Sequence, residues 1–292
     1  RARAGAAFAR GSCGRAPSGR PWPAAGGSTP DTFAHLIAAG VPMVQLSREI
    51  TPDLDFVGSD DRHGTILAME HLIGLGHRRI AFICQNQKIS TGANRYRGYC
   101  EVLARNGIPV DPTLVYPGHG TRENGSKGIQ AVLDAPYPPT AAVCMNDLAA
   151  FGAMLGLRHR GREAGPDFSI IGCDDVQEAA QWYPALTTIR NFQDEMGRTS
   201  AEFLISRIAD PAAPPRTRLA DSGNTMVDGD ALRRFVERGG AGVGRLQPAG
   251  PVAGQHLAQV RPLALATNLN QDLVLALAVD PTYPALFQTA FG

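Results

Sequence analysis

The chain has 292 residues, 43% of them hydrophobic, and a formal net charge of +1 at pH 7. This length suits one large domain or two modest ones with a sizeable core. The near-neutral charge creates no overall field that would recruit nucleic acid or an anionic membrane, so any DNA-binding part must be local or outside this chain.

The cysteine pattern and the apolar runs both favour a cytoplasmic protein. The cysteines are Cys13, Cys84, Cys100, Cys144 and Cys173. Their number is odd, they form no C-x-x-C pair, and three lie in or beside apolar runs, which favours reduced core thiols over disulfides. No apolar run reaches 18 residues, so we expect no transmembrane helix and no membrane partner. The histidines show no metal-ligand spacing, and we expect neither a metal nor a cofactor.

The apolar pattern predicts an alternation of helices and strands. Residues 1–27 are rich in Ala, Gly, Arg and Pro without a period, and we expect them to be disordered or non-native. From residue 31 onward, the helical stripes and the glycines that end them predict helices over 31–40, 61–75, 93–106, 123–134, 147–160 and 194–208. Short apolar runs predict strands over 41–46, 55–60, 80–84, 113–116, 140–145, 168–173, 186–191 and 224–229.

Strands that alternate with helices of 10–15 residues, each strand mostly apolar, are typical of parallel sheets covered on both faces. The fold class is therefore α/β, doubly wound. The stretch GLGHRRIAFIC, residues 74–84, is then a helix-to-strand connector. Gly76 ends the helix in a left-handed conformation, and the charges of Arg78 and Arg79 lie at the negative end of the helix dipole. We interpret His77 as a capping or packing residue.

Polar side chains follow the predicted strands, at the edge where open parallel sheets bind ligands. Donors and acceptors in fixed geometry at one edge suit a polyhydroxylated or otherwise polar small ligand. Trp182 or Tyr96 could cover an apolar face of such a ligand. The alternative is that Asp61, Asp147 and Asp175 only cap helices. The candidates are Ser47, Arg48, Asp60, Asp61, Arg95, Asn146, Asp147, Asp174, Asp175, Asn191 and Gln193.

Six sequence blocks, in this order, resemble the lactose-repressor (LacI/GalR) family of transcription regulators. They are AAGVPMVQLSR, FVGSDDRHGTILAMEHLIGLGHRRIAFI, RYRGYCEVLARNGI, AAVCMNDLAAFGAMLGLRHRG, PDFSIIGCDD and PALTTIRNFQDEMGRTSAEFLISRI. The resemblance covers roughly residues 28–233. It implies a two-lobed effector-binding domain of the periplasmic-binding-protein type, a homodimer, and an N-terminal helix-turn-helix that reads an operator.

Carried over by motif, the resemblance assigns site residues. Arg95 in R-Y-R-G-Y matches the ligand-binding arginine of the family, Asn146 and Asp174 match pocket positions, and Asn191 or Gln193 matches the pocket-lining loop. Ser47 stands where the family often has Asp. Trp182 lies in a segment that often joins subunit contacts. The expected effector is a sugar or a similar small polar molecule.

Nothing before Asp31 resembles the family, so we expect an incomplete N-terminal lobe and no helix-turn-helix within this chain. Residues 234–292 are a tail of unknown structure. We therefore expect an effector domain at 28–233, and operator contact only through a segment that this chain lacks.

Two other functions remain open at this point. A transporter's solute-binding protein would share the fold, but the chain shows no signal-peptide pattern. An enzyme is disfavoured, because the adjacent residues Asp174 and Asp175 make a poor acid–base pair and the sequence has no G-x-S-x-G, Walker A or H-E-x-x-H motif.

Overall fold

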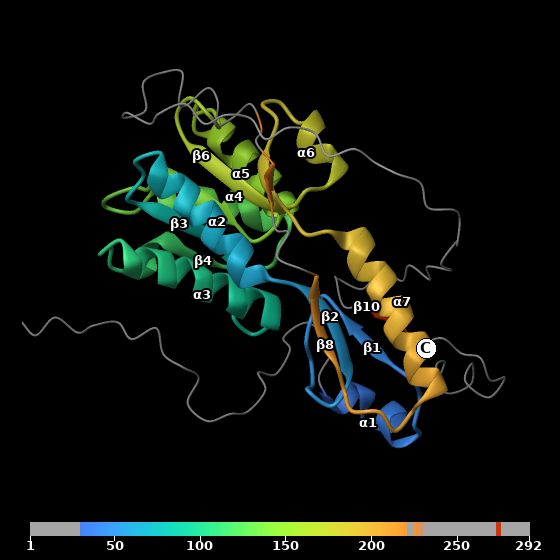
Figure 1. Ribbon diagram of the computed structural model, residues 1–292. Coiled ribbons are helices and arrows are strands. Elements are labelled where there is room, and N and C mark those ends of the chain that lie inside the picture. The colour runs from blue at the N-terminus through green and yellow to red at the C-terminus, as the bar shows by residue number, and fades with distance from the viewer. Residues whose placement is uncertain (1–29, 221–224, 228, 230–272, 276–292) are drawn as a thin grey trace, which may run out of the picture.

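The computed structural model describes residues 30–220, 225–227, 229 and 273–275, which form two lobes (Figure 1). The first lobe contains α1 (Pro30–Ala38), β1 (Val44–Leu46), β2 (Asp55–Ser59), α7 (Gln193–Ala209), β8 (Thr217–Ala220) and β10 (Leu273–Leu275). The second contains α2 (Asp61–Gly74), β3 (Ile80–Gln85), α3 (Ser90–Arg105), η1 (Pro112–Leu114), β4 (Val115–Pro117), α4 (Arg122–Leu133), β5 (Ala141–Cys144), α5 (Asp147–His159), β6 (Ser169–Asp174), α6 (Gln177–Gln181), β7 (Thr187–Arg190) and β9 (Thr225–Val227).

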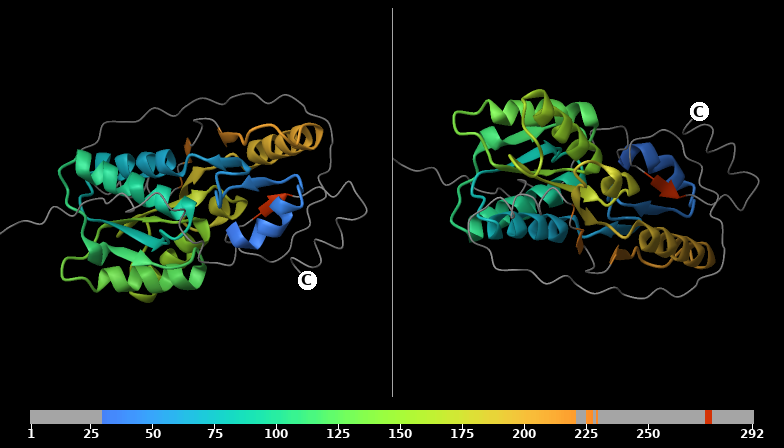
Figure 2. Two further views of the ribbon diagram at one scale, coloured as in Figure 1. Left: turned by 90° about the horizontal axis from the view of Figure 1, so that it is seen from below. Right: turned by 90° about the horizontal axis from the view of Figure 1, so that it is seen from above.

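The sheet of the second lobe has the order β4-β3-β5-β6-β7-β9, and all its strands are parallel except β9, which pairs antiparallel with β7. Helices cover both faces (Figure 2). Successive side chains of β3 alternate between these faces. Ile80 and Phe82 pack in the cluster with α2 and α3, whereas Ala81 and Ile83 pack in the cluster with α4 and α5. The predicted doubly wound α/β fold is confirmed.

The sheet of the first lobe has the order β10-β1-β2-β8, with β1, β2 and β8 parallel and β10 antiparallel to β1. Helix α7 packs on this sheet through Met196 and Leu204. Ser200 takes a buried position on α7 and donates to the carbonyl of Met196, whereas Ala201 and Ile208 are exposed.

The chain crosses between the lobes three times within residues 30–227. It enters the second lobe between β2 and α2, returns between β7 and α7, and enters again between β8 and β9. All three crossings follow the carboxyl ends of parallel strands, namely β2, β7 and β8, and such ends are where α/β folds bind ligands. The ends of β2 and β7 therefore contribute both to the joint between the lobes and to the edge where we expect the site.

The connector at 76–79 has the predicted structural role. Gly76 has φ 93°, in the left-handed region that favours glycine. The His77 ring is buried and bonds the hydroxyls of Thr140 and Ser169 at 2.8 and 2.9 Å, which ties the connector to the start of β5 and β6. Burial lowers the pKa of His77 to about 4, so the ring is neutral. The interpretation of His77 as a packing residue is confirmed.

Several elements differ from the sequence prediction. Helix α6 and strands β8 and β10 were not predicted, because each has five residues or fewer and is too short to show a period. The predicted strand at 113–116 is split, since Asp111 and Pro112 begin a 3-10 turn before β4. Cys100, Cys144 and Cys173 are buried thiols, as expected.

The predicted segment 1–27 lies outside the described residues, as does the predicted tail at 234–292 apart from β10. None of the helices that the structure describes combines the length and the apolar character needed to span a membrane.

Candidate ligand-binding site

The candidate site lies where β1, β6 and β7 end. Among the described residues other than glycine, the left-handed region holds Ser47 (φ 68°), Asp174 (φ 120°), Asp175 (φ 53°) and Phe192 (φ 47°). Each of them ends or closely follows one of these strands. Such backbone conformations cost of order 1–3 kcal/mol for residues with a Cβ, and they concentrate at functional sites. This edge of the molecule is therefore strained in a way that the rest of the described chain is not.

Arg95 lies at the centre of the site. It comes from the second turn of α3, and its side chain is only 9% exposed. Its Nε and Nη2 both contact Asp61 Oδ1 at 2.8 Å, and its Nη1 donates to the carbonyl oxygen of Met145. Its Nη2 also lies 3.9 Å from Asp174 Oδ1, which is longer than a hydrogen bond. One guanidinium thus faces two carboxylates and forms a close ion pair with only one of them, Asp61.

Asp174 ends β6 and is linked to the end of β7. Its Oδ1 accepts a hydrogen bond from Asn191 Nδ2 at 2.8 Å. Burial raises the pKa of Asp174 to about 7, against the opposing effect of Arg95, and the nearby carboxylates of Asp147 and Asp61 raise it further. Arg95, Asp174 and Asn191 are therefore brought together, as predicted.

Asp61 and Asp147 do not have the capping role offered as the alternative. The caps lie one residue earlier, since Asp60 accepts from the backbone N–H of His63 on α2 and Asn146 caps α5. Asp61 instead binds Arg95. Asp147 accepts from Thr188 Oγ1 at 2.5 Å and from the backbone N–H of Val176 at 2.9 Å. The capping alternative is therefore wrong for both residues.

Two glycines make room for these polar side chains. A Cβ on Gly172 would lie 2.2 Å from Asp147 Oδ1, and a Cβ on Gly120 would lie 2.5 Å from Asn146 Nδ2. A residue with a Cβ at either position would force the side chain of Asp147 or Asn146 to shift. Asp175, the third candidate cap, pairs with Arg190 at 2.5 Å and makes no cap contact with α6.

Asn146 directly follows Met145, whose carbonyl accepts from Arg95, and its own side chain is already engaged. Its Oδ1 accepts from the N–H of Ala149 at 2.9 Å, and its Nδ2 donates to the carbonyl of Gly120 at 3.0 Å. The side chain is buried and links the segment before α4 to the start of α5. A direct contact between Asn146 and a ligand stays a prediction, and the geometry adds a structural role that sequence reasoning missed.

The remaining predicted residues, Ser47 and Gln193, belong to the first lobe. Ser47 belongs to the loop after β1, on the other lobe. Two residues later, the backbone N–H of Glu49 donates to Ser90 Oγ at 3.0 Å, so this loop faces the start of α3. Gln193 is the first residue of α7 and is exposed. Their contact with a ligand stays a prediction.

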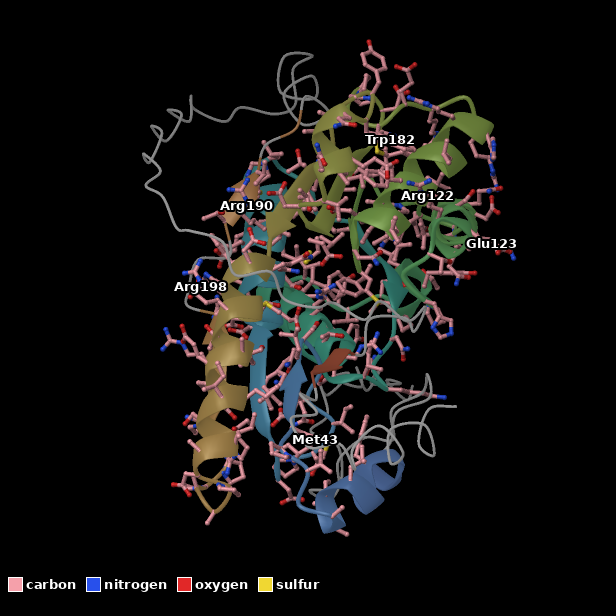
Figure 3. All side chains as sticks on the ribbon, turned by 90° about the vertical axis from the view of Figure 1, so that its right-hand side faces the viewer. Met43, Arg122, Glu123, Trp182, Arg190 and Arg198 are labelled. Carbon is pink, nitrogen blue, oxygen red and sulfur yellow. The ribbon has the colours of Figure 1, made fainter. Side chains whose placement is uncertain are left out.

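Neither aromatic candidate lines the Arg95 cluster. Tyr96 stacks on Tyr99 at 6.0 Å between ring centroids and belongs to the core below α3. Trp182 stacks on Phe151 at 4.5 Å, and the Arg122 guanidinium lies 5.7 Å from the Trp182 ring (Figure 3). The predicted cover of a ligand by these rings is therefore not what the structure shows.

A cavity of about 540 Å³ lies at the opposite end of β3, between the C-terminal part of α3 and η1. Its floor includes the buried side chains of Ile80, Tyr99 and Leu103. Arg79 on its rim is paired with Asp111 at 2.9 Å. Across the described residues, no group of three or more His, Cys, Asp or Glu side chains is placed to hold a metal ion.

Comparison with known proteins agrees with this geometry. Residues 69–231 match the family model of the periplasmic binding protein-like domain. The HTH-type transcriptional repressor CytR of Escherichia coli (strain K12) is 33% identical over 183 residues, which cover 62% of this chain and 54% of CytR. The chain thus spans about half the length of the curated relatives it matches.

Solved structures show the same likeness. A complex of the transcriptional regulator CelR with cellobiose has a TM-score of 0.65 and 30% identity, covering 70% of this chain and 63% of CelR. A LacI family transcriptional regulator from Enterococcus faecium with bound ribose has a TM-score of 0.60 and 30% identity, covering 66% and 71% of the two chains. Together with the family model and the strand-end cluster, these matches show that the chain belongs to the LacI family of transcriptional regulators and carries its periplasmic-binding-protein-like domain.

Proposed function

We propose that residues 28–233 form the effector-binding domain of a transcriptional regulator, which takes a small, polar, sugar-like ligand between its two lobes. The matched segment 69–231 lies inside these bounds. Two solved relatives carry cellobiose and ribose, which supports a sugar as the ligand class.

The observation that carries the proposal is the spacing between Arg95 and Asp174. Nη2 and Oδ1 are 3.9 Å apart, too far to bond each other directly. A hydroxyl group can accept from the guanidinium and donate to the carboxylate, because it is both donor and acceptor. Asn191 fixes the carboxylate from the other side. A polyol presents such hydroxyls in a row, so it can use this pair and its neighbours together.

The site is built into the crossings between the lobes, which gives ligand binding a mechanical consequence. Asp61 directly follows the crossing from β2, and Asn191 lies in the crossing from β7. A ligand held by Arg95 and Asp174 therefore contacts the two side chains that bind these crossings, since Arg95 binds Asp61 and Asp174 binds Asn191. If it favours one lobe orientation by a few kcal/mol, the population of that orientation changes by orders of magnitude.

The regulated output in this proposal is operator binding. The +1 net charge of this chain supports the inference that the lobes do not hold DNA by themselves. We infer that a helix-turn-helix segment reads the operator and that the lobe orientation sets the spacing of two such segments in a homodimer.

The surface of α5 supports self-association. Leu148 and Leu155 are seven residues apart on one face of this helix, and they are 40% and 36% exposed. Tyr183, which shortly follows the end of α6, is 68% exposed. Trp182 lies under Arg122, which Glu178 holds with both oxygens at 2.7 and 2.6 Å. An apolar face with a charged rim fits a protein interface. We infer that a second copy of the chain covers it.

A thermal-shift screen of neutral sugars against the full chain tests the ligand proposal. At least one sugar should raise the melting temperature of the wild type, and Arg95→Ala should weaken its binding by about 100-fold, because a buried charged donor is lost. Arg105→Ala, on the exposed face of the same helix, is the matched control. A sugar that stabilises Arg95→Ala as well as it stabilises Arg105→Ala would remove Arg95 from the site.

Leu155→Glu tests the proposed interface. Placing a carboxylate on the apolar face of α5 should convert a dimer into a monomer in light scattering, while the response to the sugar remains. Leu219→Glu, on an exposed strand of the other lobe, is the matched control. A wild-type chain that is monomeric at high concentration contradicts the interface.

A further inference from the structure

The charge of Arg95 is already matched within the protein. Asp61 receives both Nε and Nη2 on one oxygen at 2.8 Å, and the two side chains are 9% and 3% exposed. Ser59 Oγ also donates to the same oxygen at 3.3 Å. These contacts are the geometry of a charge-assisted pair held in place before any ligand arrives.

The charge balance of the site follows from this pairing. In the part of the chain that the structure describes, the ion pairs made by Asp61 and Asp174 both come from Arg95. With both carboxylates ionised, one cation faces two anions. With Asp174 protonated, one cation faces one anion. In neither state does the site carry the surplus positive charge that an anionic ligand requires.

We propose that Asp61 makes the site selective for uncharged ligands and against anionic ones, such as sugar phosphates and sugar acids. An arginine without a partner binds phosphate and carboxylate groups through its paired N–H donors. Asp61 occupies those donors and cancels the charge, so that Arg95 offers its remaining N–H groups to neutral oxygen atoms. This inference rests on the proposed function, since it concerns the ligand of the same site.

The role of Asp61 can be isolated with sulfate, an anion that needs no knowledge of the natural effector. In wild type, Asp174 could replace Asp61 as the partner of Arg95, so the comparison is made in an Asp174→Asn background. Asp174→Asn keeps the Arg95–Asp61 pair, whereas the double variant Asp61→Asn with Asp174→Asn leaves Arg95 without a carboxylate. Asp174→Asn with Glu202→Gln, an exposed residue of α7, removes one further charge elsewhere.

Sulfate titrations followed by melting temperature, at constant ionic strength adjusted with chloride, give the result. We expect Asp174→Asn and Asp174→Asn with Glu202→Gln to bind sulfate with similar affinity. The double variant that lacks Asp61 should bind sulfate at least about tenfold more tightly. Equal responses from all three would overturn the proposal, because Asp61 would then not be what excludes anions.

A second measurement uses the wild-type chain and does not depend on any variant folding. Ribose with ribose 5-phosphate, and galactose with galacturonate, form neutral and anionic pairs. We expect stabilisation by the neutral members alone. An anionic member that binds as well as its neutral counterpart would overturn the selectivity and leave the proposed function intact. No response to any neutral sugar would contradict the proposed function, and the sulfate result would still decide the role of Asp61.

Discussion

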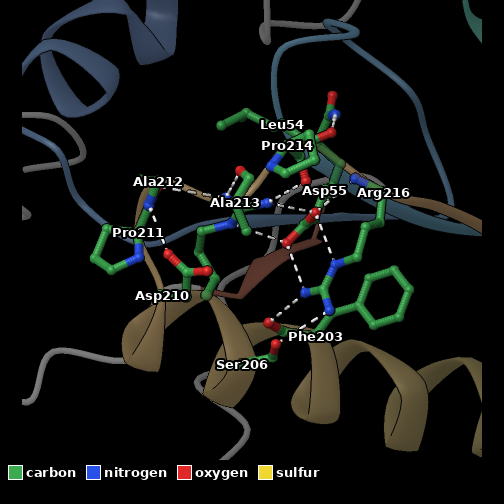
Figure 4. Close-up of polar contacts among 12 residues, drawn as sticks. Leu54, Asp55, Phe203, Ser206, Asp210, Pro211, Ala212, Ala213, Pro214 and Arg216 are labelled. Atoms are coloured by element: carbon green, nitrogen blue, oxygen red, sulfur yellow. Dashed lines mark hydrogen bonds and ion pairs between the residues drawn. The ribbon is translucent and has the colours of Figure 1, made fainter.

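Each lobe contains a buried centre of aspartate and arginine, and the two centres differ in how completely they are satisfied. In the first lobe, Asp55 at the start of β2 receives Arg207 and Arg216 together (Figure 4). Arg207 Nη2 lies 2.8 Å from Oδ1, Arg216 Nη2 lies 3.1 Å from Oδ2, and the Arg216 backbone N–H donates to Oδ1 at 2.7 Å. One carboxylate is shared by two cations, and both of its oxygens are used.

In the second lobe the ratio is reversed, since one cation, Arg95, faces Asp61 and Asp174. The electrostatic results follow. Burial alone would raise the pKa of Asp55, but the hydrogen bonds from Arg207 and Arg216 bring it below its usual range. The pKa of Asp174 is instead raised to about 7, because burial outweighs the distant guanidinium. The Asp55 centre, in which two arginines share one carboxylate, stabilises the first lobe. The Arg95 centre, in which one arginine faces two carboxylates, keeps hydrogen-bonding capacity for a ligand; we call it the open centre.

The centre around Asp55 also fixes the chain between α7 and β8. Arg207 donates to the carbonyls of Ala213 and Pro214, and the guanidinium of Arg216 lies 4.2 Å from the centroid of the Phe203 ring. These contacts hold the segment between α7 and β8 in place. The comparison teaches that a buried ion pair alone does not identify a binding site. The site is proposed at the centre where carboxylates outnumber cations, at the end of β6.

The largest effect on stability is expected at Asp55. Asp55→Ala should lower the free energy of unfolding by about 3 kcal/mol, because two arginines lose their shared partner and Arg207 remains mostly buried. Urea unfolding measures the change. Asp53→Ala removes an exposed carboxylate two residues away and serves as the control. Equal losses from the two variants would break the comparison, since the Asp55 centre would then have no special role.

The next effect is a pH dependence from Asp174. Because its pKa is about 7 in the folded chain and about 4 when unfolded, the folded state holds the proton over this range, so its contribution to stability falls as pH rises from about 4 to 7. Asp174→Asn should remove this fall, worth about 2 kcal/mol after allowance for partial solvent access.

His77 produces the opposite slope, because its pKa is lowered to about 4 and protonation of the unfolded chain below pH 6.5 favours unfolding. The informative quantity is therefore the difference between wild type and Asp174→Asn in urea unfolding at several pH values. A difference that stays constant from pH 4 to pH 8 would show that Asp174 titrates normally and that the second centre is not open.

The smallest effect is expected at Asn146. Asn146→Ala should lower the free energy of unfolding by about 1 kcal/mol, because the cap of α5 and the bond to Gly120 are lost. Its effect on sugar binding should be smaller than that of Arg95→Ala. Thr121→Ala, which removes the cap of α4, is the matched control for stability. If Asn146→Ala abolishes sugar binding while Thr121→Ala does not, Asn146 belongs among the direct ligand contacts.

The sequence by itself determined the layers and the edge where the site lies. Helical and strand periods are local, so the alternation at 31–208 predicted the doubly wound sheets. The glycines after the helices behaved as expected, with φ of 67° at Gly40, 66° at Gly107 and 68° at Gly161. Because polar residues that follow parallel strands share one edge, Arg95, Asp174 and Asn191 could be expected to meet.

Only the tertiary structure decided which of these polar residues face one another. Asp61 and Arg95 are 34 positions apart, and Asp61 and Asp60 are indistinguishable as candidate caps in the sequence. Asp55 and Arg207 are 152 positions apart and meet only because the chain crosses between the lobes and returns. Periodicity in the sequence indicates which secondary structure a segment forms and which of its faces is buried. The partner of a buried charge depends on where distant segments cross, and no local pattern records that.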